Sequence, residues 1–173
     1  MLFSDNFNAN PLGVSATPAG WNVTRGSVDV VRPYPVQGRQ IDMDGVSRAP
    51  AVMQTQTAFH FKSGYIYKLS FDYGKRSPSQ QFLRFGVGSI TDNLTASGPI
   101  FAQLVRHSFS FAVTSGFDAS ILFSGVKGRK AGMMLDNVML EEISTIPLPP
   151  AAMLLGSGLV GLGALKRRRT SKA

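Results

Sequence analysis

The feature that most constrains the fold is the alternation of side chains between Tyr65 and Tyr73. Every second residue from Tyr65 onward is a large apolar one, and the residues between them are mostly polar. A period of two residues is what a half-buried antiparallel strand requires, because successive side chains leave a strand on opposite faces. This segment therefore predicts a β-strand with one face on a core and the other in solvent.

Similar short segments, separated by Gly, Pro, Asn and Ser, occur along residues 1–143. Further strands are predicted at Leu2–Phe7, Trp21–Arg25, Val28–Arg32, Arg39–Met43, Phe82–Val87, Ile100–Val105, Ser108–Thr114, Ala119–Phe123 and Met133–Glu142. About ten short strands at this spacing favour an all-β, antiparallel two-sheet sandwich or jelly roll. No long helical pattern precedes the C-terminal segment.

The C-terminal segment has a different character. Residues 146–165 carry no charge, and a helix of that length would span about 30 Å, the thickness of a hydrocarbon core. Prolines in residues 144–150 disfavour helix there, so the predicted transmembrane helix is 151–165, and the basic tail 166–173 follows. Because Lys and Arg stay on the cytoplasmic side, residues 1–143 are expected outside the cytoplasm. The alternative, a buried helix of a globular domain, does not explain the basic block behind it.

The order of these parts resembles the PEP-CTERM class of bacterial sorting signals, and most closely its Val-Pro-Leu-Pro-Ala variant. The residues that carry the resemblance are the motif Ile146, Pro147, Leu148 and Pro149, the Gly156-Ser157-Gly158-Leu159 step, and the basic residues Lys166, Arg167, Arg168 and Arg169. Ile146 replaces the Val of that variant, and Pro150 stands where the variant prefers Ala.

The resemblance implies recognition by an exosortase, a membrane protease of Gram-negative bacteria. The chain would cross the inner membrane transiently by one C-terminal span and then reach the cell surface or the extracellular matrix. The span is rich in small residues, which lets another membrane helix approach closely. A permanently anchored protein without processing is the alternative.

An exported protein should begin with a signal peptide, yet residues 1–6 are already polar by Ser4. Three explanations are open: a misassigned start codon, a trimmed chain, or export by another route. We expect a lost N-terminus.

The charge balance gives little support to nucleic-acid binding. The net charge is +8, but residues 1–165 carry 13 Lys and Arg against 10 Asp and Glu, so most of the excess lies in the tail. A basic tail alone could bind nucleic acid, but this would leave the apolar segment before it unexplained. The chain has no cysteine, which excludes disulfides, thiolate metal sites and a Cys nucleophile.

Several pieces of residues 2–143, taken in order, resemble the galactose-binding-like jelly-roll domains of PEP-CTERM proteins. They are Asp5-Asn6-Phe7-Asn8, Trp21-Asn22-Val23, Gly26-Ser27-Val28-Asp29-Val30, Ile41-Asp42-Met43-Asp44-Gly45, Gly64–Phe71 and Leu135–Leu140. Such folds frequently hold a structural calcium ion between the first and last strands, and Asp5 and Asp136 match those places. Calcium takes six or more oxygen ligands, and few can be named here. The alternative is a solvated Asp5 and an Asp136 in a turn or at a strand edge.

Residues typical of catalysis are not combined in any recognisable motif. Asp42-x-Asp44-Gly45 resembles the opening of a calcium loop, but Met53 stands where that loop needs Glu, so a turn is predicted. His60 and His107 are isolated, and the adjacent Glu141 and Glu142 would point to opposite faces of a strand. We therefore expect no enzyme.

Sugar-binding proteins stack an aromatic ring on the apolar face of a sugar and surround it with polar groups. The candidates for this role are Trp21, Tyr34 and Tyr73, although a lone Trp in an apolar strand is usually a core residue. The sequence thus predicts an exported, non-enzymatic surface protein with a sorting signal. The alternative is a carbohydrate-binding module that acts on exopolysaccharide.

Overall fold

The computed structural model describes residues 1–33, 38–46, 49–77, 80–96, 104–126 and 132–145, and these residues contain strands and turns but no helix. The seven-stranded sheet runs in the order β11 (Val105–Val113), β8 (Tyr65–Lys75), β14 (Met133–Thr145), β5 (Gln40–Asp42), β4 (Val28–Val31) and β2 (Gly13–Ala16), and β1 (Phe3–Asp5) also pairs with β14. The five-stranded sheet runs in the order β10 (Ile90–Ala96), β9 (Gln81–Val87), β13 (Ile121–Gly125), β6 (Val52–Thr55) and β3 (Trp21–Arg25). A small third sheet pairs β12 (Phe117–Ala119) with β7 (Phe59–Phe61).

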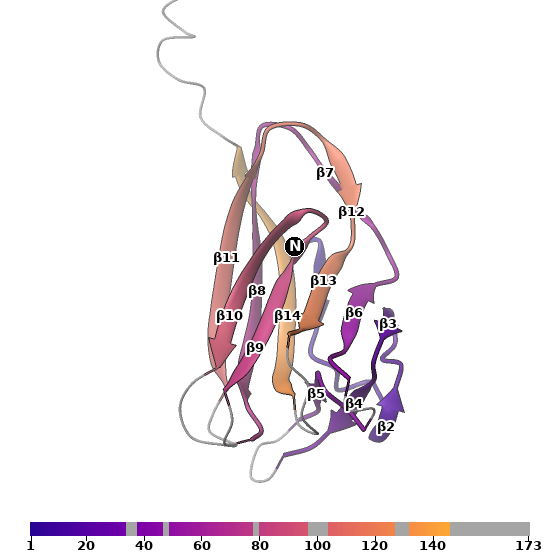
Figure 1. Cartoon of the computed structure of the whole chain (residues 1–173). Coiled ribbons are helices and arrows are strands. Elements are labelled where there is room, and N and C mark those ends of the chain that lie inside the picture. Colours follow the sequence, from indigo (N-terminus) through magenta and orange to yellow (C-terminus); the bar gives the residue numbers. More distant parts are fainter. Residues whose placement is uncertain (34–37, 47–48, 78–79, 97–103, 127–131, 146–173) are drawn as a thin grey trace, which may run out of the picture.

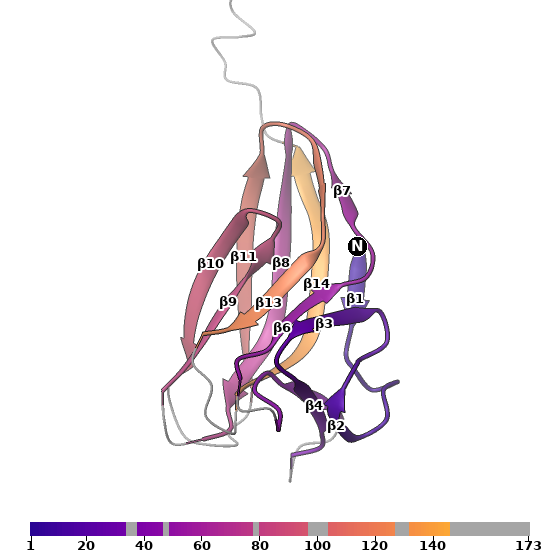
Figure 2. The same ribbon diagram turned by 45° about the vertical axis from the view of Figure 1, so that its right-hand side comes forward.

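The two larger sheets form two layers. In Figure 1, β9, β10 and β13 lie in front of β8, β11 and β14, and the pair of β7 and β12 lies at the upper end. The turned view in Figure 2 separates the same layers, with β3 and β6 on the side of β13. The predicted all-β two-sheet sandwich is therefore confirmed. The predicted C-terminal helix at 151–165 lies outside the described residues.

The strand pattern differs from the sequence prediction in its smaller parts. The strands β2, β6, β7, β10 and β12 were not predicted; four of them have only three or four residues, and β10 is largely polar. β14 continues to Thr145, two residues beyond the predicted domain boundary. Short strands leave little room for an alternating pattern, so their pairing depends on the sheet around them.

The alternation that predicted β8 is realised between two partners. β8 pairs with β11 on one side and with β14 on the other, so that Leu69 lies opposite Phe109 and Leu140. Tyr67, Leu69 and Phe71 are fully buried. On the other face, Lys68 forms an ion pair with Glu141 at 2.8 Å. One face of β8 thus packs in the core, and its other face is directed to solvent.

Aromatic side chains from both sheets meet in the core. The ring of Phe71 on β8 lies 4.9 Å from that of Phe85 and 5.0 Å from that of Phe123, both on the five-stranded sheet, between ring centroids. Trp21 packs against Phe123 at 5.9 Å. Edge-to-face aromatic pairs contribute about 0.5–1.5 kcal/mol each beyond the burial of their area. This cluster therefore fixes the two sheets against each other.

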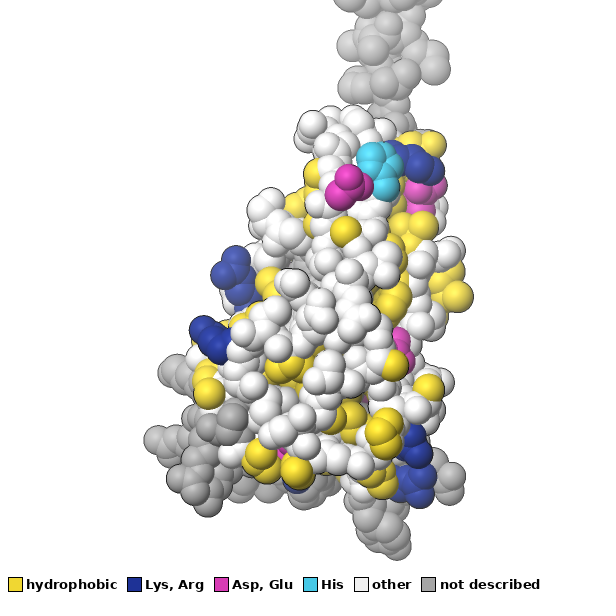
Figure 3. Space-filling view, turned by 90° about the vertical axis from the view of Figure 1, so that its right-hand side faces the viewer, with side chains coloured by type: hydrophobic (Ala, Val, Ile, Leu, Met, Phe, Trp, Pro, Cys, Tyr) yellow, Lys and Arg dark blue, Asp and Glu magenta, His cyan; other side chains and the backbone are white. Residues whose placement is uncertain are grey.

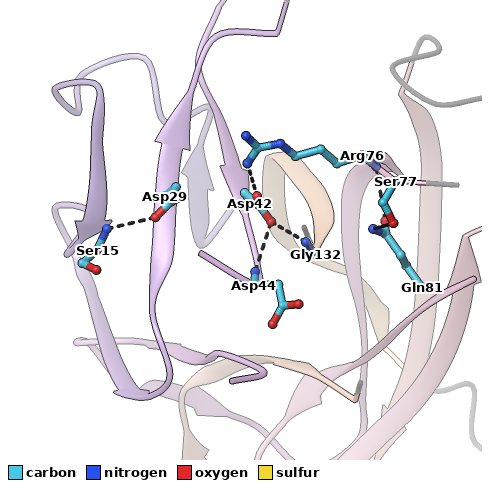
Figure 4. A network of polar contacts seen from close by, with 8 residues as sticks. All are labelled: Ser15, Asp29, Asp42, Asp44, Arg76, Ser77, Gln81 and Gly132. Carbon is cyan, nitrogen blue, oxygen red and sulfur yellow. Dashed lines mark hydrogen bonds and ion pairs between the residues drawn. The ribbon is translucent and has the colours of Figure 1, made fainter. Parts of the chain in front are cut away.

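A buried carboxylate joins three segments at the lower end of the sandwich. Asp42 is 0% exposed and forms an ion pair with Arg76, and its Oδ1 accepts hydrogen bonds from the backbone N–H groups of Asp44 and Gly132 at 3.1 and 2.6 Å. Figure 4 shows these contacts converging on Asp42. The hydrogen bond from Asp44 closes a turn, so the predicted turn is confirmed, and Asp42 serves as its anchor.

Candidate functional site

The outer face of the five-stranded sheet carries two rows of side chains that run across the strands. In the first row, successive Cα partners are Asn22, Gln54, Leu122, Gly86 and Thr91. In the second row they are Arg25, Val52, Ser124, Arg84 and Asn93. We call these ten residues the polar face. Each row takes one residue from each of five strands that are far apart in the sequence.

The core positions determine which way these residues point. Trp21, Met53, Phe85 and Phe123 are fully buried, and each is the direct neighbour of a polar-face residue in the chain. Because side chains alternate along a strand, the neighbours leave the sheet on the outer side. Accordingly, Asn22, Arg84 and Asn93 are exposed. The aromatic core therefore positions the polar face.

The amide side chains of the polar face are available for a ligand. Within the described part of the chain, the side-chain amides of Asn22, Gln54 and Asn93 have no hydrogen-bond partner. Each amide presents both donors and an acceptor. A molecule that lies along the rows would meet amides that can accept hydrogen bonds from its hydroxyl groups or donate hydrogen bonds to them.

Arg84 is one of the two cations of this face, and Thr91 on the neighbouring strand holds its position. The Thr91 hydroxyl accepts hydrogen bonds from Arg84 Nε at 3.2 Å and from Nη2 at 3.0 Å. β9 and β10 approach closely here because Gly86 has no Cβ, which would overlap the Ile90 carbonyl oxygen. The remaining N–H groups of Arg84 stay directed to solvent, since the side chain is exposed.

The aromatic residues predicted for sugar stacking lie elsewhere. Trp21 is fully buried, and its Nε1 donates a hydrogen bond to Asp5 Oδ2 at 2.8 Å, so its ring has no face for a sugar. This is the core position given above as its alternative. Tyr73 is half-buried on the inner side of β8, next to Phe71 and His107. Tyr34 lies outside the described residues.

No Trp, Tyr or Phe among the described residues is fully open to solvent. The aromatic residue that lies on the outer side of the five-stranded sheet is Phe82, which is half-buried and pairs with Thr95. Phe82 and Arg84 are separated by one residue in β9, so their side chains leave the strand on the same side. Phe82 therefore lies beside the polar face. Recognition on this face would therefore rest on polar groups more than on ring stacking.

Asp5 and Asp136 lie on neighbouring strands, β1 and β14, and each has a hydrogen-bond partner. Asp5 Oδ1 accepts a hydrogen bond from the backbone N–H of Phe7 at 2.7 Å, in addition to the bond from Trp21. Asp136 Oδ1 accepts one from the N–H of Asn137 at 2.7 Å. Asn137 has a φ of 48°, and the register of β14 shifts at this point. The bulge lets both carboxylates lie near the junction of the two strands.

The pKa of Asp136 is shifted from its usual value. The residue is 8% exposed and lies opposite Asp72 in the sheet. Burial is the main cause that raises the pKa of Asp136 to about 6; the hydrogen bond from Asn137 opposes this shift, and the negative charges of Asp72 and Asp5 add to it. The folded chain therefore holds a proton here at mildly acidic pH.

The fit of these two residues to a calcium ion is incomplete. Calcium takes six to eight oxygen ligands. Among the residues that the structure describes, no three His, Cys, Asp or Glu side chains form a group that could hold a metal. Calcium at Asp5 and Asp136 stays a prediction from the resemblance.

The histidines and the adjacent glutamates occupy separate places. His60 on β7 and Asp118 on β12 have exposed side chains that lie 2.8 Å apart. His107 lies among Phe71, Tyr73 and Phe85, and burial lowers its pKa, which Asp92 partly offsets. Glu141 and Glu142 contact different partners: Glu141 pairs with Lys68, and Glu142 pairs with Lys62.

The predicted C-terminal signal lies beyond the part of the chain that the structure describes. Ile146, Pro147, Leu148, Pro149 and Lys166 to Arg169 all lie outside the described residues. The part of the chain that the structure describes contains no helix long and apolar enough to cross a membrane.

Sequence reasoning missed most of the polar face. Arg84 lies in a strand that was predicted, but Gln54 and Asn93 lie in strands that were not. The sequence pattern that could have revealed them is a polar residue with an apolar, core-facing residue on either side of it. Only the pairing of the strands shows that these residues form rows.

Comparison with known proteins places the fold but not a family. No family model matches the chain. It is 32% identical over 157 residues to halomucin of Haloquadratum walsbyi, a match that covers 87% of this chain and 2% of that protein. The chain thus spans only a small part of the curated relative that it matches.

Several of the similar solved structures are carbohydrate-binding modules or include one, and another is an exo-β-agarase with a TM-score of 0.54 at 8% identity, over 83% of this chain and 26% of its own. The CBM22-1–GH10 modules of a Clostridium thermocellum endo-1,4-β-D-xylanase have a TM-score of 0.53 at 13% identity, over 83% of this chain and 28% of theirs. A family 16 carbohydrate-binding module has a TM-score of 0.51 at 16% identity, over 72% of this chain and 92% of its own. The CBM22-1 xylan-binding domain from Paenibacillus barcinonensis has a TM-score of 0.50 at 16% identity, over 83% and 95%. At these identities the likeness shows a shared jelly-roll fold.

Proposed function

We propose that this chain is a non-enzymatic, glycan-binding β-sandwich whose ligand lies on the polar face. The observation that carries the proposal is the set of free amides of Asn22, Gln54 and Asn93, held on three strands of one rigid sheet. A sugar presents hydroxyl groups that both donate and accept hydrogen bonds, and an amide matches both roles. The two rows are long enough to contact several units of an extended polysaccharide.

The shared fold supports this proposal. The similar xylanase modules were crystallised with xylohexaose, and the Paenibacillus barcinonensis domain is a xylan-binding domain. Those ligands belong to those proteins. For this chain they favour a polysaccharide as the class of ligand, in agreement with the exopolysaccharide alternative drawn from the sequence.

Binding of the full chain to a panel of soluble polysaccharides tests the proposal. We expect measurable binding to at least one glycan, and we expect Asn22→Ala, Gln54→Ala and Asn93→Ala each to weaken it about fivefold. A lost hydrogen bond costs about 1 kcal/mol, and about 1.4 kcal/mol corresponds to a tenfold change in affinity. Isothermal titration calorimetry in mild detergent gives the constants.

The control is Ser110→Ala on β11, an exposed polar position of the other sheet. It should bind as the unaltered chain does. Equal affinities for the unaltered chain and all three amide variants would remove the polar face from the proposal, and no binding to any glycan would remove the function.

We further propose that residues 146–173 direct the chain to the cell surface or matrix through an exosortase. The support is the order of Pro-rich motif, uncharged span and basic block in the sequence. The lipid membrane and the exosortase would be partners of this segment, and polysaccharide the partner of the sandwich.

The intact mass of the protein from native cells, recorded for each cell fraction, tests this second proposal. A surface or medium form that lacks about 25 C-terminal residues, the length needed to span a bilayer, is the expected result. Full-length protein confined to the inner membrane would indicate a permanent anchor, and full-length protein in the cytosol would contradict export altogether.

A further inference from the structure

Charged residues are distributed unevenly between the two sheets. Seven of the ten acidic residues lie on strands of the seven-stranded sheet: Asp5, Asp29, Asp42, Asp72, Asp136, Glu141 and Glu142. The strands of the five-stranded sheet contain three charged residues, Arg25, Arg84 and Asp92. The sheet that carries the polar face is therefore nearly free of acids.

The one acid of the five-stranded sheet does not belong to the polar face. Asp92 is the Cα partner of Phe85, whose ring is buried in the core. Its carboxylate acts electrostatically on His107, which lies on the inner side of β11. Asp92 thus leaves β10 on the side opposite to Arg84 and Asn93.

The two arginines lie in the same row of the polar face. The register runs from Arg25 through Val52 and Ser124 to Arg84, which are three strand spacings, or about 14 Å. In the space-filling view of Figure 3, Lys and Arg side chains stand out along the left edge. An oligosaccharide, rather than a single sugar, is needed to reach both cations.

Neither arginine has an acidic partner among the residues that the structure describes. Across the described ranges, Arg25 and Arg84 take part in no ion pair, whereas Arg76 and Arg106 each pair with an aspartate. Thr91 holds the guanidinium of Arg84 without consuming its charge. A positioned guanidinium with free N–H groups matches the planar fork of a carboxylate, which it binds in a bidentate manner.

We infer that the polar face is specific for carboxylated polysaccharides, those built with uronic acid units, and that Arg84 binds the carboxylate of a central unit while Arg25 binds that of a more distant one. This inference rests on the proposed function. The amides of Asn22, Gln54 and Asn93 then bind the hydroxyl groups between the carboxylates. A neutral glycan would leave both cations without a partner.

The test compares uronate polysaccharides with neutral forms of the same backbone. The probes are polygalacturonate, alginate and hyaluronate, each beside its carboxyl-reduced counterpart, titrated into the full chain in mild detergent at low and moderate salt. We expect at least one uronate to bind about tenfold or more tightly than its reduced form. In Arg84→Gln this preference should fall to about twofold.

Two further variants show whether the uronate preference depends on positive charge alone or on the guanidinium group at position 84. Arg84→Lys keeps the charge but loses the fork, so it should retain only part of the preference. Arg32→Gln removes the same charge from an exposed position at the end of β4, and should retain the full preference. The fluorescence of the single Trp21, which lies in the core, reports whether each variant is folded.

The other outcomes are distinguishable. Equal binding of uronates and their reduced forms would overturn the inference and leave the proposed function standing, whereas no binding to any glycan would remove both. A uronate preference that survives in Arg84→Gln would belong to another surface, such as the basic tail, and would overturn the assignment. Tighter, Arg84-dependent binding to dextran sulfate or DNA than to any uronate would show a general polyanion surface and contradict carboxylate specificity.

Discussion

At the scale of single residues, the buried carboxylates of Asp42 and Asp136 have different surroundings. Asp42 has Arg76 as its counter-charge and two backbone N–H donors. Asp136 lies close to Asp72 and Asp5 and has one backbone donor. Removal of a buried ion pair's partner is strongly destabilising, whereas a buried carboxylate near other acids takes up a proton. The first residue holds a turn in place, and the second makes the stability of the fold depend on pH.

The pH dependence follows from the sign of the shift at Asp136. The pKa is 3.8 in the unfolded chain and about 6 in the folded one, so the folded state binds the proton more tightly. The stability contributed by this proton is complete below pH 4 and is lost as the pH rises through 6.

Asp136→Asn should therefore raise the free energy of unfolding at pH 7 by on the order of 2 kcal/mol and change it little near pH 3.5. The Asn side chain keeps an oxygen for the N–H of Asn137. Urea denaturation at both pH values, followed by Trp21 fluorescence, measures the difference. A variant that is less stable at pH 7 than the unaltered chain would show that the carboxylate is stabilising there, as it would be with a bound cation.

At the scale of elements, the three-residue strand β1 is held by a few contacts. Its Phe3 packs against Trp21 with ring centroids 5.6 Å apart, and its Asp5 accepts hydrogen bonds from Trp21 and Phe7. A buried donor that loses its acceptor costs about 1–3 kcal/mol. The end of β1 is therefore coupled to the core through one carboxylate.

Asp5→Ala should lower the free energy of unfolding by about 2 kcal/mol and alter the emission of Trp21, because the indole N–H loses its partner. Asn6→Ala is the matched control: it removes an exposed turn hydrogen bond to Asn8 and should cost less than about 0.5 kcal/mol. Similar losses in the two variants would mean that the Trp21 contact contributes little.

The elements also show what the sequence could predict. The alternation in β8 and the Trp21–Arg25 pattern are local, so they predicted strands and a sandwich correctly. The polar face depends on register, because Asn22, Gln54 and Asn93 become neighbours only when three separate strands pair in one way. Local periodicity indicates that Asn22 points opposite to Trp21, but it does not show what lies beside it. For the same reason the sequence left two roles open for Trp21, a stacking residue or a core residue: its burial depends on contacts such as that with Phe123, about a hundred residues further along the chain.

At the scale of the whole molecule, the sandwich has two outer faces of different composition. The seven-stranded sheet carries paired ions such as Lys68–Glu141 and Arg106–Asp72, and the five-stranded sheet carries free amides and arginines without ion pairs. Paired surface ions contribute little to binding or stability. This asymmetry is the reason why the proposed function places the ligand on the five-stranded sheet.

The most direct test of this account is an NMR titration of the isotope-labelled full chain with uronate oligosaccharides, with backbone amide shifts followed residue by residue. The account predicts that the shifts concentrate on β3, β6, β13, β9 and β10, and that the Nε–H signal of Arg84 moves with them. Shifts confined to β8, β11 and β14, or no shift at saturating oligosaccharide, would contradict the claim that the polar face is the glycan-binding site.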